Sequence, residues 1–263
     1  MLTTVSGSPL EIIKKQTTAA EDYLVRDFMD MVQRIYQYEL FKPMLDLVAT
    51  LAMQGRLSFN LAPKKVFDLD EGNCRTVETG TRAGTTIKTF VITIKKMKTD
   101  VVIHEIGHMV ENESGVSLDM NFNRAIAADL RGNYTKNISL QTAIKNIMIM
   151  EVANYPDSHK SSELFTRYFQ LLALAKEVAG FAAEYAYTIL DVYKAFPNTI
   201  DWIWSNLYTP MFSRIDSRIA MASFNFTVPI NEIRHKWAKE KIGSVHKDPE
   251  KPKWSRAIKS IKD

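Results

Sequence analysis

The chain has 263 residues, of which 46% are hydrophobic, and a formal net charge of +4. This length is enough for one large domain, or for a core with appended helices, and the nearly balanced charge gives no sign of a nucleic-acid or strongly acidic partner. The single cysteine, Cys74, excludes an intramolecular disulfide and a cysteine-based zinc site, which leaves histidine and carboxylate side chains as available metal ligands. We expect Cys74 to be an ordinary residue of a turn or strand.

The first part of the chain is predicted to be helical. From residue 9 to residue 54, apolar side chains such as Leu24, Phe28 and Met31 recur at helical spacing. We expect two helical pieces here, whose apolar stripe belongs to the core or to a docking face.

Residues 57–98 have the composition of short strands and turns. Phe90, Ile92 and Ile94 alternate with more polar positions, as expected of a strand with one buried face. The edge strand of such a sheet can pair with the backbone of an extended peptide; the alternative is a half-buried strand that makes no contact with a substrate. The candidate strands are residues 65–69, 75–78 and 85–96, with Gly80 and Gly84 in a turn before the last of them.

The chain is predicted to be helical from residue 113 almost to its end. Ser161 or Ser162 is expected to cap a long apolar helix that follows a loop containing Pro156. Residues 243–263 are basic and are expected to be loosely held. The candidate helices are residues 121–130, 138–150, 163–193 with a potential break at Gly180, 198–217 and 229–241.

Residues 100–110 contain the most informative motif, His104-Glu105-Ile-Gly-His108. A His-Glu-x-x-His spacing within an apolar helical run is typical of zinc peptidases. Residues four apart lie on one face of a helix, so both imidazoles can bind a single ion, and Glu105 beside them can accept a proton from water. The alternative is two core histidines that fall four apart by chance; the strongly apolar surroundings favour the metal site.

The helix that carries this motif is expected over residues 98–112, capped by Thr99 or Asp100. Gly107 disfavours a helix by about 1 kcal/mol relative to alanine. Its presence is understandable if a neighbouring backbone or a bound metal ion must lie close to it.

A catalytic zinc ion has three protein ligands and an open position for water. The metzincin pattern would place Gly and His three and six positions after the second histidine, where this chain has Glu111 and Ser114, so we expect the third ligand to be a carboxylate of a later helix. Glu163, 55 positions after the second histidine, is the first candidate, although it could simply favour the N-terminus of its helix. Glu184 is the second candidate and Glu177 is the third.

Two segments resemble a known family of enzymes. Residues 162–169, Ser-Glu-Leu-Phe-Thr-Arg-Tyr-Phe, resemble the Ser/Ala-Glu-Phe-Phe-Ala-Glu-Ala-Phe segment of the anthrax-lethal-factor-like metallopeptidases, which include the bacterial Pro-Pro endopeptidases. Residues 196–203 resemble the Ala-Pro-Lys-Thr-Phe-Gln-Phe-Ile ending of the same family. The resemblance covers about residues 85–207, and it implies that Glu163 is the zinc ligand.

The resemblance also implies that a tyrosine shortly before the ligand glutamate stabilises the tetrahedral intermediate. Tyr155 is the nearest match, and its phenol would donate to the developing oxyanion. A loop tyrosine that packs on the surface is the alternative. His159, in the same loop, is expected to be exposed, and a role as a second donor is the less favoured interpretation.

These observations predict an α+β fold, mostly α-helical and zincin-like, with a small mixed sheet before the active-site helix. We expect an N-terminal helical segment over residues 1–56, a catalytic domain over residues 57–217, and a C-terminal helix with a basic tail over residues 218–263. The three parts could also form one compact domain.

The expected function is that of a zinc-dependent endopeptidase of the gluzincin type, which acts on a protein or peptide. His104, His108 and Glu163 would bind Zn²⁺, and Glu105 and Tyr155 would be catalytic. The resemblance implies a bacterial toxin or translocated effector that contributes to virulence by cleaving a specific host protein. The alternative is an inactive zincin scaffold that acts as a protein-interaction module, and the retention of Glu105 argues against it.

Residues 1–9 lack the basic and apolar regions of a secretory leader, and no run of about 18 apolar residues occurs. We therefore expect a soluble protein without a membrane span, cytoplasmic or secreted without a cleaved leader. No nucleic-acid partner is expected, and the oligomeric state is left open.

Overall fold

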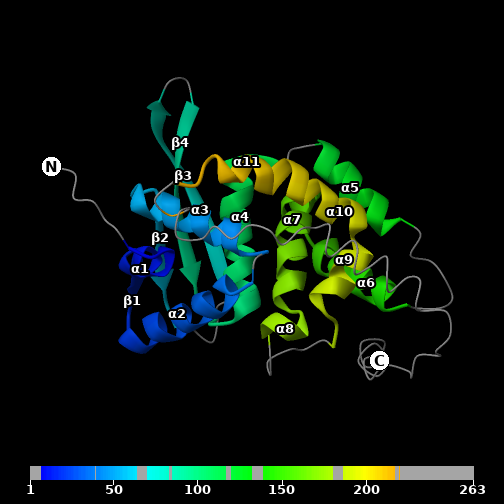
Figure 1. The fold of residues 1–263 in the computed structure, drawn as a ribbon, viewed down its shortest axis with the longest axis horizontal. Helices are drawn as coiled ribbons and strands as arrows, with labels where there is room; N and C mark the ends of the chain where they lie inside the picture. The colour runs from blue at the N-terminus through cyan, green and yellow to red at the C-terminus, as the bar shows by residue number, and fades with distance from the viewer. Residues whose placement is uncertain are drawn as a thin grey trace. The chain divides into compact units, whose positions relative to one another are not determined.

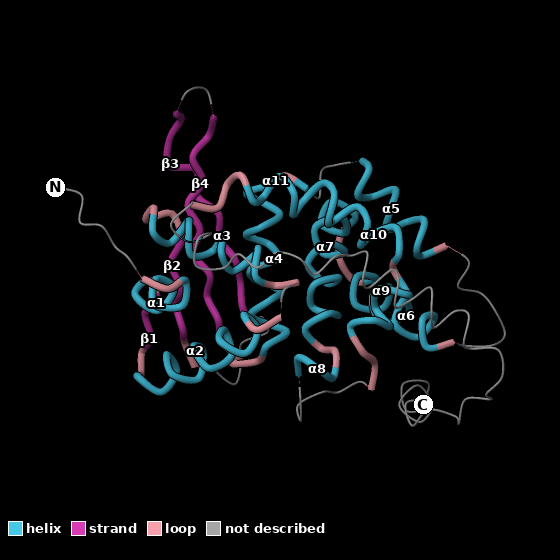
Figure 2. Tube along the Cα trace, in the orientation of Figure 1, coloured by secondary structure: helices cyan, strands magenta, loops and turns pink. Residues whose placement is uncertain are grey.

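The computed structural model describes residues 7–38, 40–63, 70–82, 85–116, 120–131, 139–179, 186–216 and 219. These residues belong to the first of two units into which the chain divides, Met1–Ala222. The second unit, Ser223–Asp263, lies outside the described residues, together with the predicted helix 229–241 and the basic segment 243–263. The described fold is mixed α+β, with helices around a small sheet (Figure 1; Figure 2), which confirms the predicted coarse class.

Three helices and a short strand form the first part of the chain, where the sequence predicts two helical pieces. They are α1 (Pro9–Lys15), β1 (Thr17–Ala19), α2 (Asp22–Tyr36) and α3 (Lys42–Met53). Strand β1 is too short to show an alternation in the sequence, and its backbone pairs with a strand about 40 residues later. The apolar stripe of α2 is buried, so it belongs to the core.

The sheet has four strands in the order β1-β2-β4-β3. Strands β2 (Leu57–Leu61) and β4 (Thr85–Ile94) pair in parallel, as do β1 and β2, whereas β3 (Gly72–Arg82) pairs antiparallel with β4. Phe90 and Ile92 are fully buried, as the alternation predicts. Strand β3 therefore forms one edge of the sheet.

Two of the three predicted strands are observed: residues 75–78 lie within the longer β3, and the predicted strand 85–96 corresponds to β4, which ends two residues earlier. The predicted turn at Gly80 is wrong for that residue: Gly80 lies within β3, at a bulge where the register shifts between Glu78 and Gly80. Gly84 and the predicted strand 65–69 lie outside the described residues.

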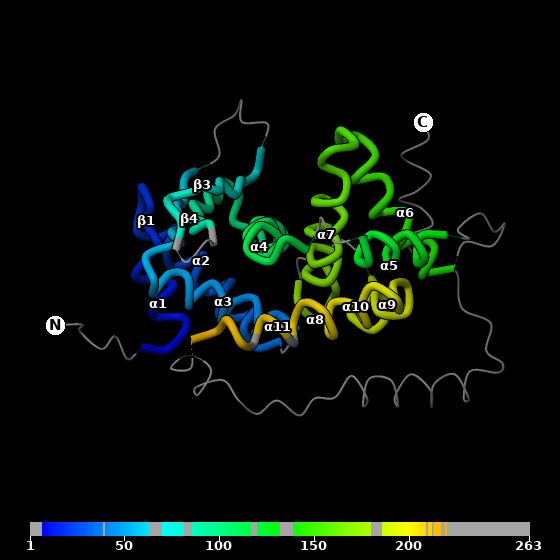
Figure 3. The backbone as a smooth tube through the Cα atoms, turned by 90° about the horizontal axis from the view of Figure 1, so that it is seen from above, coloured from blue at the N-terminus to red at the C-terminus, as the bar shows by residue number. Residues whose placement is uncertain are grey.

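Helix α4 (Thr99–Ser114) carries the His-Glu-x-x-His motif and packs between the sheet and α7 (Asp157–Ala173), as Figure 3 shows. The predicted cap is wrong, because Lys98 is the N-cap residue and makes no side-chain capping hydrogen bond. The helix ends at Gly115, whose φ of 69° lies in the left-handed region that glycine adopts without strain.

Most of the remaining described chain is helical. The predicted helix 163–193 is divided, because α7 ends at Ala173 and two short helices follow it. Gly180, the predicted break, lies outside the described residues. The elements are α5 (Met120–Leu130), α6 (Leu140–Ala153), α8 (Lys176–Ala179), α9 (Ile189–Ala195), α10 (Pro197–Trp202), a π-helical turn (Ile203–Tyr208) and α11 (Thr209–Phe212). In the described part of the chain, no helix combines the length and apolar character that crossing a membrane requires.

The predicted loop before Ser161 is only three residues long, from Asn154 to Pro156. Helix α7 begins at Asp157, directly after Pro156, and an acidic residue in the first turn is favourable for the helix dipole. Ser161 and Ser162 therefore lie within the helix and do not cap it, which corrects the prediction.

Asp129, near the end of α5, holds the start of α10. Its carboxylate is 3% exposed. It accepts hydrogen bonds from the backbone N–H and side-chain amide of Asn198, at 3.1 and 2.7 Å, and from the backbone N–H and hydroxyl of Thr199, both at 2.7 Å. A side chain of one helix thus satisfies the first N–H groups of another.

Asp129→Ala is expected to lower the free energy of unfolding by about 2–3 kcal/mol, because four donors lose their acceptor. Asp30→Ala, on an exposed position of α2, is the control and should change it by less than about 0.5 kcal/mol. Urea denaturation of both variants measures the difference. Equal stability of the two variants would contradict the capping role.

Candidate metal centre

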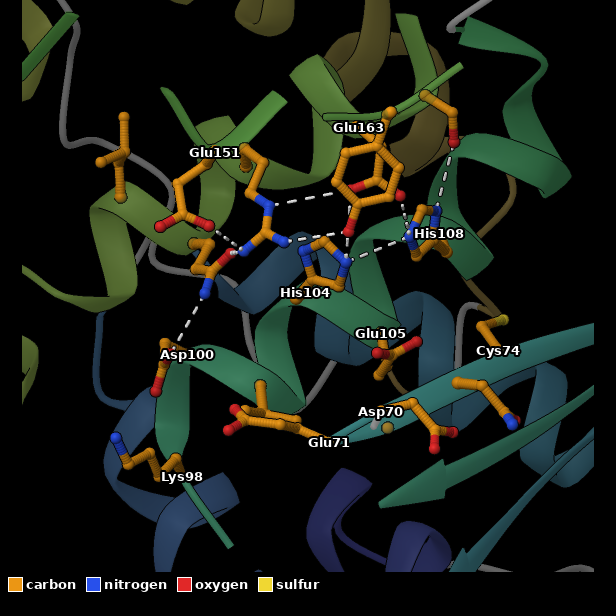
Figure 4. A pocket seen from close by; sticks show the side chains of 18 of the residues that line it. Asp70, Glu71, Cys74, Lys98, Asp100, His104, Glu105, His108, Glu151 and Glu163 are labelled. Carbon is orange, nitrogen blue, oxygen red and sulfur yellow. Dashed lines mark hydrogen bonds and ion pairs between the residues drawn. The ribbon is translucent and has the colours of Figure 1, made fainter. Parts of the chain in front are cut away.

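Two histidines of α4 and one glutamate of α7 converge on a common point (Figure 4). The Nε2 atoms of His104 and His108 are 3.2 Å apart. Glu163 places Oε1 at 3.5 Å from Nε2 of His108 and Oε2 at 3.7 Å from Nε2 of His104. One ligand atom of each residue lies within 4.8 Å of the others, close enough for all three to bind one metal ion.

Glu163 is not the first residue of its helix. Because α7 begins at Asp157, Glu163 lies in its second turn, and its side chain is buried against α4. A position this far into the helix gains little from the helix dipole. The placement therefore favours a ligand over a glutamate that only stabilises the helix start.

The distances between neighbouring ligand groups are close to those of a tetrahedral zinc site. Two atoms that each lie about 2.1 Å from a zinc ion are about 3.4 Å apart in a tetrahedral site. The two Nε2 atoms are 3.2 Å apart, and each lies close to this distance from a different oxygen of the Glu163 carboxylate, at 3.5 Å for His108 and 3.7 Å for His104. In addition, Oε2 of Glu163 is buried without a hydrogen-bond partner among the described residues; the guanidinium of Arg167 lies 3.7 Å from it, which leaves this oxygen able to bind a cation directly.

The charges around the two histidines also favour a cation. Burial, followed by the nearby His108, lowers the pKa of His104 to about 2. Burial alone would lower the pKa of His108, but the carboxylates of Glu111 and Glu163 outweigh it and raise that pKa to about 9. The same negative charge that retains a proton on His108 would attract a divalent cation, which must displace that proton to bind.

Glu111 and Ser162 hold the imidazole of His108 from its other side. Nδ1 of His108 lies 3.4 Å from Oε2 of Glu111 and 3.2 Å from the hydroxyl of Ser162, which also donates to the same carboxylate oxygen. A metal-binding histidine commonly donates its second N–H to a carboxylate, which fixes the ring and its tautomer. Glu111 is therefore placed to orient His108 toward the common point.

Gly107 allows the close contact between the two helices. A Cβ atom at this position would lie 3.2 Å from Cγ2 and 3.3 Å from Cα of Thr166 on α7. The expected close approach at this glycine thus comes from the backbone of α7. Since Thr166 is three residues after Glu163, the same contact brings the carboxylate to the histidines.

Glu105 lies beside the histidines, on the side of β3 (Figure 4). Its side chain rests against Gly72, where an added Cβ would lie only 2.9 Å from Cγ of Glu105. Burial raises the pKa of Glu105 to about 7, with help from Glu163 and against the opposing charge of His108. A carboxyl group that titrates near neutral pH is suited to accept and release a proton.

The site opens into a cleft of about 770 Å³. Its walls come from α4, α6, α7 and the start of β3, and they include both polar and apolar side chains. The apolar lining includes Ile147, Leu171 and Leu174. A cleft of this size has the dimensions of a small-ligand or peptide site.

The other predicted site residues have different positions. Tyr155 and the exposed His159 both line the cleft. Glu177 lies on α8, where its carboxylate accepts a hydrogen bond from the backbone N–H of Ile189, and it is not part of the cluster. Glu184 lies outside the described residues.

Cys74 is in strand β3, as predicted, and lines the cleft. Burial, followed by the charges of Glu105 and Glu111, raises the pKa of its thiol above the usual range. Because the thiolate is the form that binds metals, this environment disfavours Cys74 as a ligand.

Sequence reasoning missed four contributors to the site: Gly72, Glu111, Ser162 and Arg167. The contact of Glu111 with His108 was predictable, because Glu111 follows the second histidine by three positions and so lies on the same helix face. Arg167 was predictable in the same way, because it lies four positions after Glu163. Gly72 and Ser162 depend on contacts between elements distant in sequence, which no local pattern indicates.

Comparison of the chain with models of protein families, with curated proteins and with solved structures finds no match.

Glu111→Ala is expected to weaken zinc binding by about 10- to 100-fold, because His108 loses the carboxylate that orients it. Glu113→Ala is the matched control: Glu113 is on the same helix but pairs with Arg56, at 2.8 Å. Competition with a chromophoric chelator gives both affinities. Equal affinities in the two variants would remove Glu111 from the site.

Gly107→Ala is expected to destabilise the protein, although alanine favours a helix by about 1 kcal/mol over glycine. The new methyl group would lie 3.2 Å from Cγ2 and 3.3 Å from Cα of Thr166, so α7 must shift by a few tenths of an ångström, and zinc affinity should fall as well. Adding Thr166→Ala removes Cγ2, the nearest atom, and should recover part of the loss. Thermal melting and zinc titration measure both effects, and a more stable Gly107→Ala variant would refute the close contact.

Proposed function

We propose that this protein is a zinc-dependent endopeptidase of the gluzincin type. The observation that carries the proposal is the convergence of His104, His108 and Glu163 with Glu105 beside them in an open cleft. Two histidines and a glutamate are a known ligand set for catalytic zinc, and the cleft leaves room for a water molecule and a substrate. The resemblance of residues 162–169 to the lethal-factor-like metallopeptidases agrees with this assignment.

The presence of Glu105 distinguishes this proposal from other metal chemistry. Two histidines and one carboxylate also bind iron in non-haem oxygenases. A carboxylate buried next to the histidines supplies the proton acceptor that hydrolysis uses and that metal binding alone does not need. We therefore assign a hydrolytic reaction.

When bound, zinc supplies Lewis acidity, which makes water more acidic and polarises a carbonyl oxygen. Glu105 accepts the proton of the attacking water and passes it to the leaving amine. Glu111 and Ser162 keep the imidazole of His108 in its ligating orientation. Tyr155, which lines the cleft, donates a hydrogen bond to the oxyanion of the tetrahedral intermediate.

The proposed substrate is a protein or peptide in extended conformation. Strand β3 is an edge of the sheet, and Gly72, Asn73 and Cys74 at its start line the cleft. A peptide backbone can pair with such an edge, which would lead its chain past the metal centre. This arrangement favours a peptide over a small molecule as the substrate.

Glu105→Gln and Glu163→Ala separate the base from the ligand. Glu105→Gln keeps the size of the side chain but cannot accept the proton, so it should retain zinc and lose at least ~10²-fold in cleavage rate. Glu163→Ala removes a ligand and should lose both zinc and activity. Glu113→Gln, with the same loss of charge on α4 away from the cleft, should retain both.

The substrate is not needed in advance for this experiment. A peptide library prepared from a proteome is incubated with each variant, new termini are quantified by mass spectrometry, and metal content is measured on the same samples. Full activity of Glu105→Gln would refute the proposed mechanism. Bound zinc without any cleavage by the unmodified protein would instead favour an inactive scaffold that binds a partner.

A further inference from the structure

Arg167 is a charged side chain beside the metal centre that the proposed mechanism does not use. It lies on α7, one turn after Glu163, and it lines the cleft with only 17% of its side chain exposed. Residues four apart share a helix face, so Arg167 is aligned with the metal ligand. A largely buried guanidinium requires partners, and the identity of its partners indicates its role.

The guanidinium lies between Glu163 and Tyr155. Its Nε is 3.7 Å from Oε2 of Glu163, and its Nη2 donates to the phenol oxygen of Tyr155 at 3.2 Å. Its remaining nitrogen, Nη1, lies 3.4 Å from Glu151 on α6 and donates to the side chain of Gln170. One planar group thus contacts the ligand carboxylate, the proposed oxyanion donor and a carboxylate of the neighbouring helix.

Nε of Arg167 and Oε2 of Glu163 are both buried without a hydrogen-bond partner among the described residues. They are a donor and an acceptor of opposite charge, and 3.7 Å is slightly longer than a hydrogen bond. A small movement of the carboxylate toward Nε would therefore form a hydrogen bond between the two groups. The position of Glu163 is in this way linked to that of Arg167.

The contact with Tyr155 has a chemical consequence. Because the guanidinium has no acceptor atom, it can only donate to the phenol oxygen. The hydroxyl hydrogen of Tyr155 is thus left to point to another acceptor, such as a developing oxyanion. Arg167 therefore both places the phenol and leaves its proton available.

We propose that Arg167 is a positioning residue that couples the metal ligand Glu163 to Tyr155, an inference that rests on the proposed function. Metal binding draws the Glu163 carboxylate into place, the guanidinium moves with it, and the phenol of Tyr155 follows. The fixed fork of an arginine can contact both groups at once, whereas the single ammonium of a lysine cannot. A purely structural clamp between α6 and α7 would instead depend on the ion pair with Glu151.

The test follows Tyr155 directly by ¹⁹F NMR of the full chain, with 3-fluorotyrosine incorporated at position 155 and Zn²⁺ as the only added ligand. In the otherwise unmodified protein, zinc should shift the resonance. In Arg167→Lys, which keeps the charge, zinc should bind about tenfold more weakly and the shift at saturating zinc should fall to less than half. In Glu151→Gln, which removes the negative charge of the partner on α6, the shift should persist.

Several results would overturn the proposal. A full zinc-induced shift in Arg167→Lys would show that zinc binding affects Tyr155 without Arg167. Loss of the shift in Glu151→Gln would show that Arg167 only links α6 to α7. If Arg167→Lys does not fold, Arg167→Gln replaces it, and failure of both variants to fold would also identify a clamp. Zinc binding without a shift in the unmodified sequence would refute only this inference, whereas absence of zinc binding would refute the proposed function as well.

Discussion

Gly107 of α4 lies so close to Thr166 on α7 that an added Cβ would be 3.2 Å from Cγ2 and 3.3 Å from Cα of that residue. Helix α4 carries both histidines and α7 carries Glu163, so the distance between the two helices decides whether the three ligand atoms can meet. The sheet supports α4 from the other side, and Gly72 of β3 leaves the space that Glu105 occupies. Gly72 thus allows α4 to pack closely on the sheet, and Gly107 allows α7 to pack closely on α4.

This close packing buries several charged side chains next to one another, where like charges repel and water does not solvate them. Glu105, Glu111 and Glu163 are each less than 10% exposed, and they surround two imidazoles. Buried carboxylates are unfavourable without compensation, and here it comes from Arg167, from His108 and from any cation at the common point. Buried carboxylates destabilise a hydrophobic core, but they favour the binding of a metal ion. We therefore interpret the arrangement as functional.

The sequence predicts those parts of this site that depend on local spacing. His104 and His108 lie on one helix face because they are four residues apart, and the apolar pattern around them predicts α4 to within two residues at each end. The buried alternation of Phe90 and Ile92 predicts β4 in the same way.

Features that depend on distant contacts were not predictable from local patterns. Strand β1 forms because its backbone hydrogen-bonds to β2. The capping of α10 by Asp129 likewise joins residues about 70 positions apart. The predicted start of α7 is wrong because Ser161 and Ser162, which resemble capping residues, lie inside the helix. There Ser162 contacts His108. Tertiary contacts, which no short pattern encodes, override the local preference in each case.

The placement of the ligands along the chain has a consequence for the order of assembly. The hairpin of β3 and β4 forms from neighbouring residues, and α4 follows it directly, so the two histidines can be in position early. Glu163 arrives only when a helix from more than 50 residues later docks onto α4. A cation that needs all three ligands therefore binds the state in which α7 is docked on α4, and a higher cation concentration stabilises this docked state further.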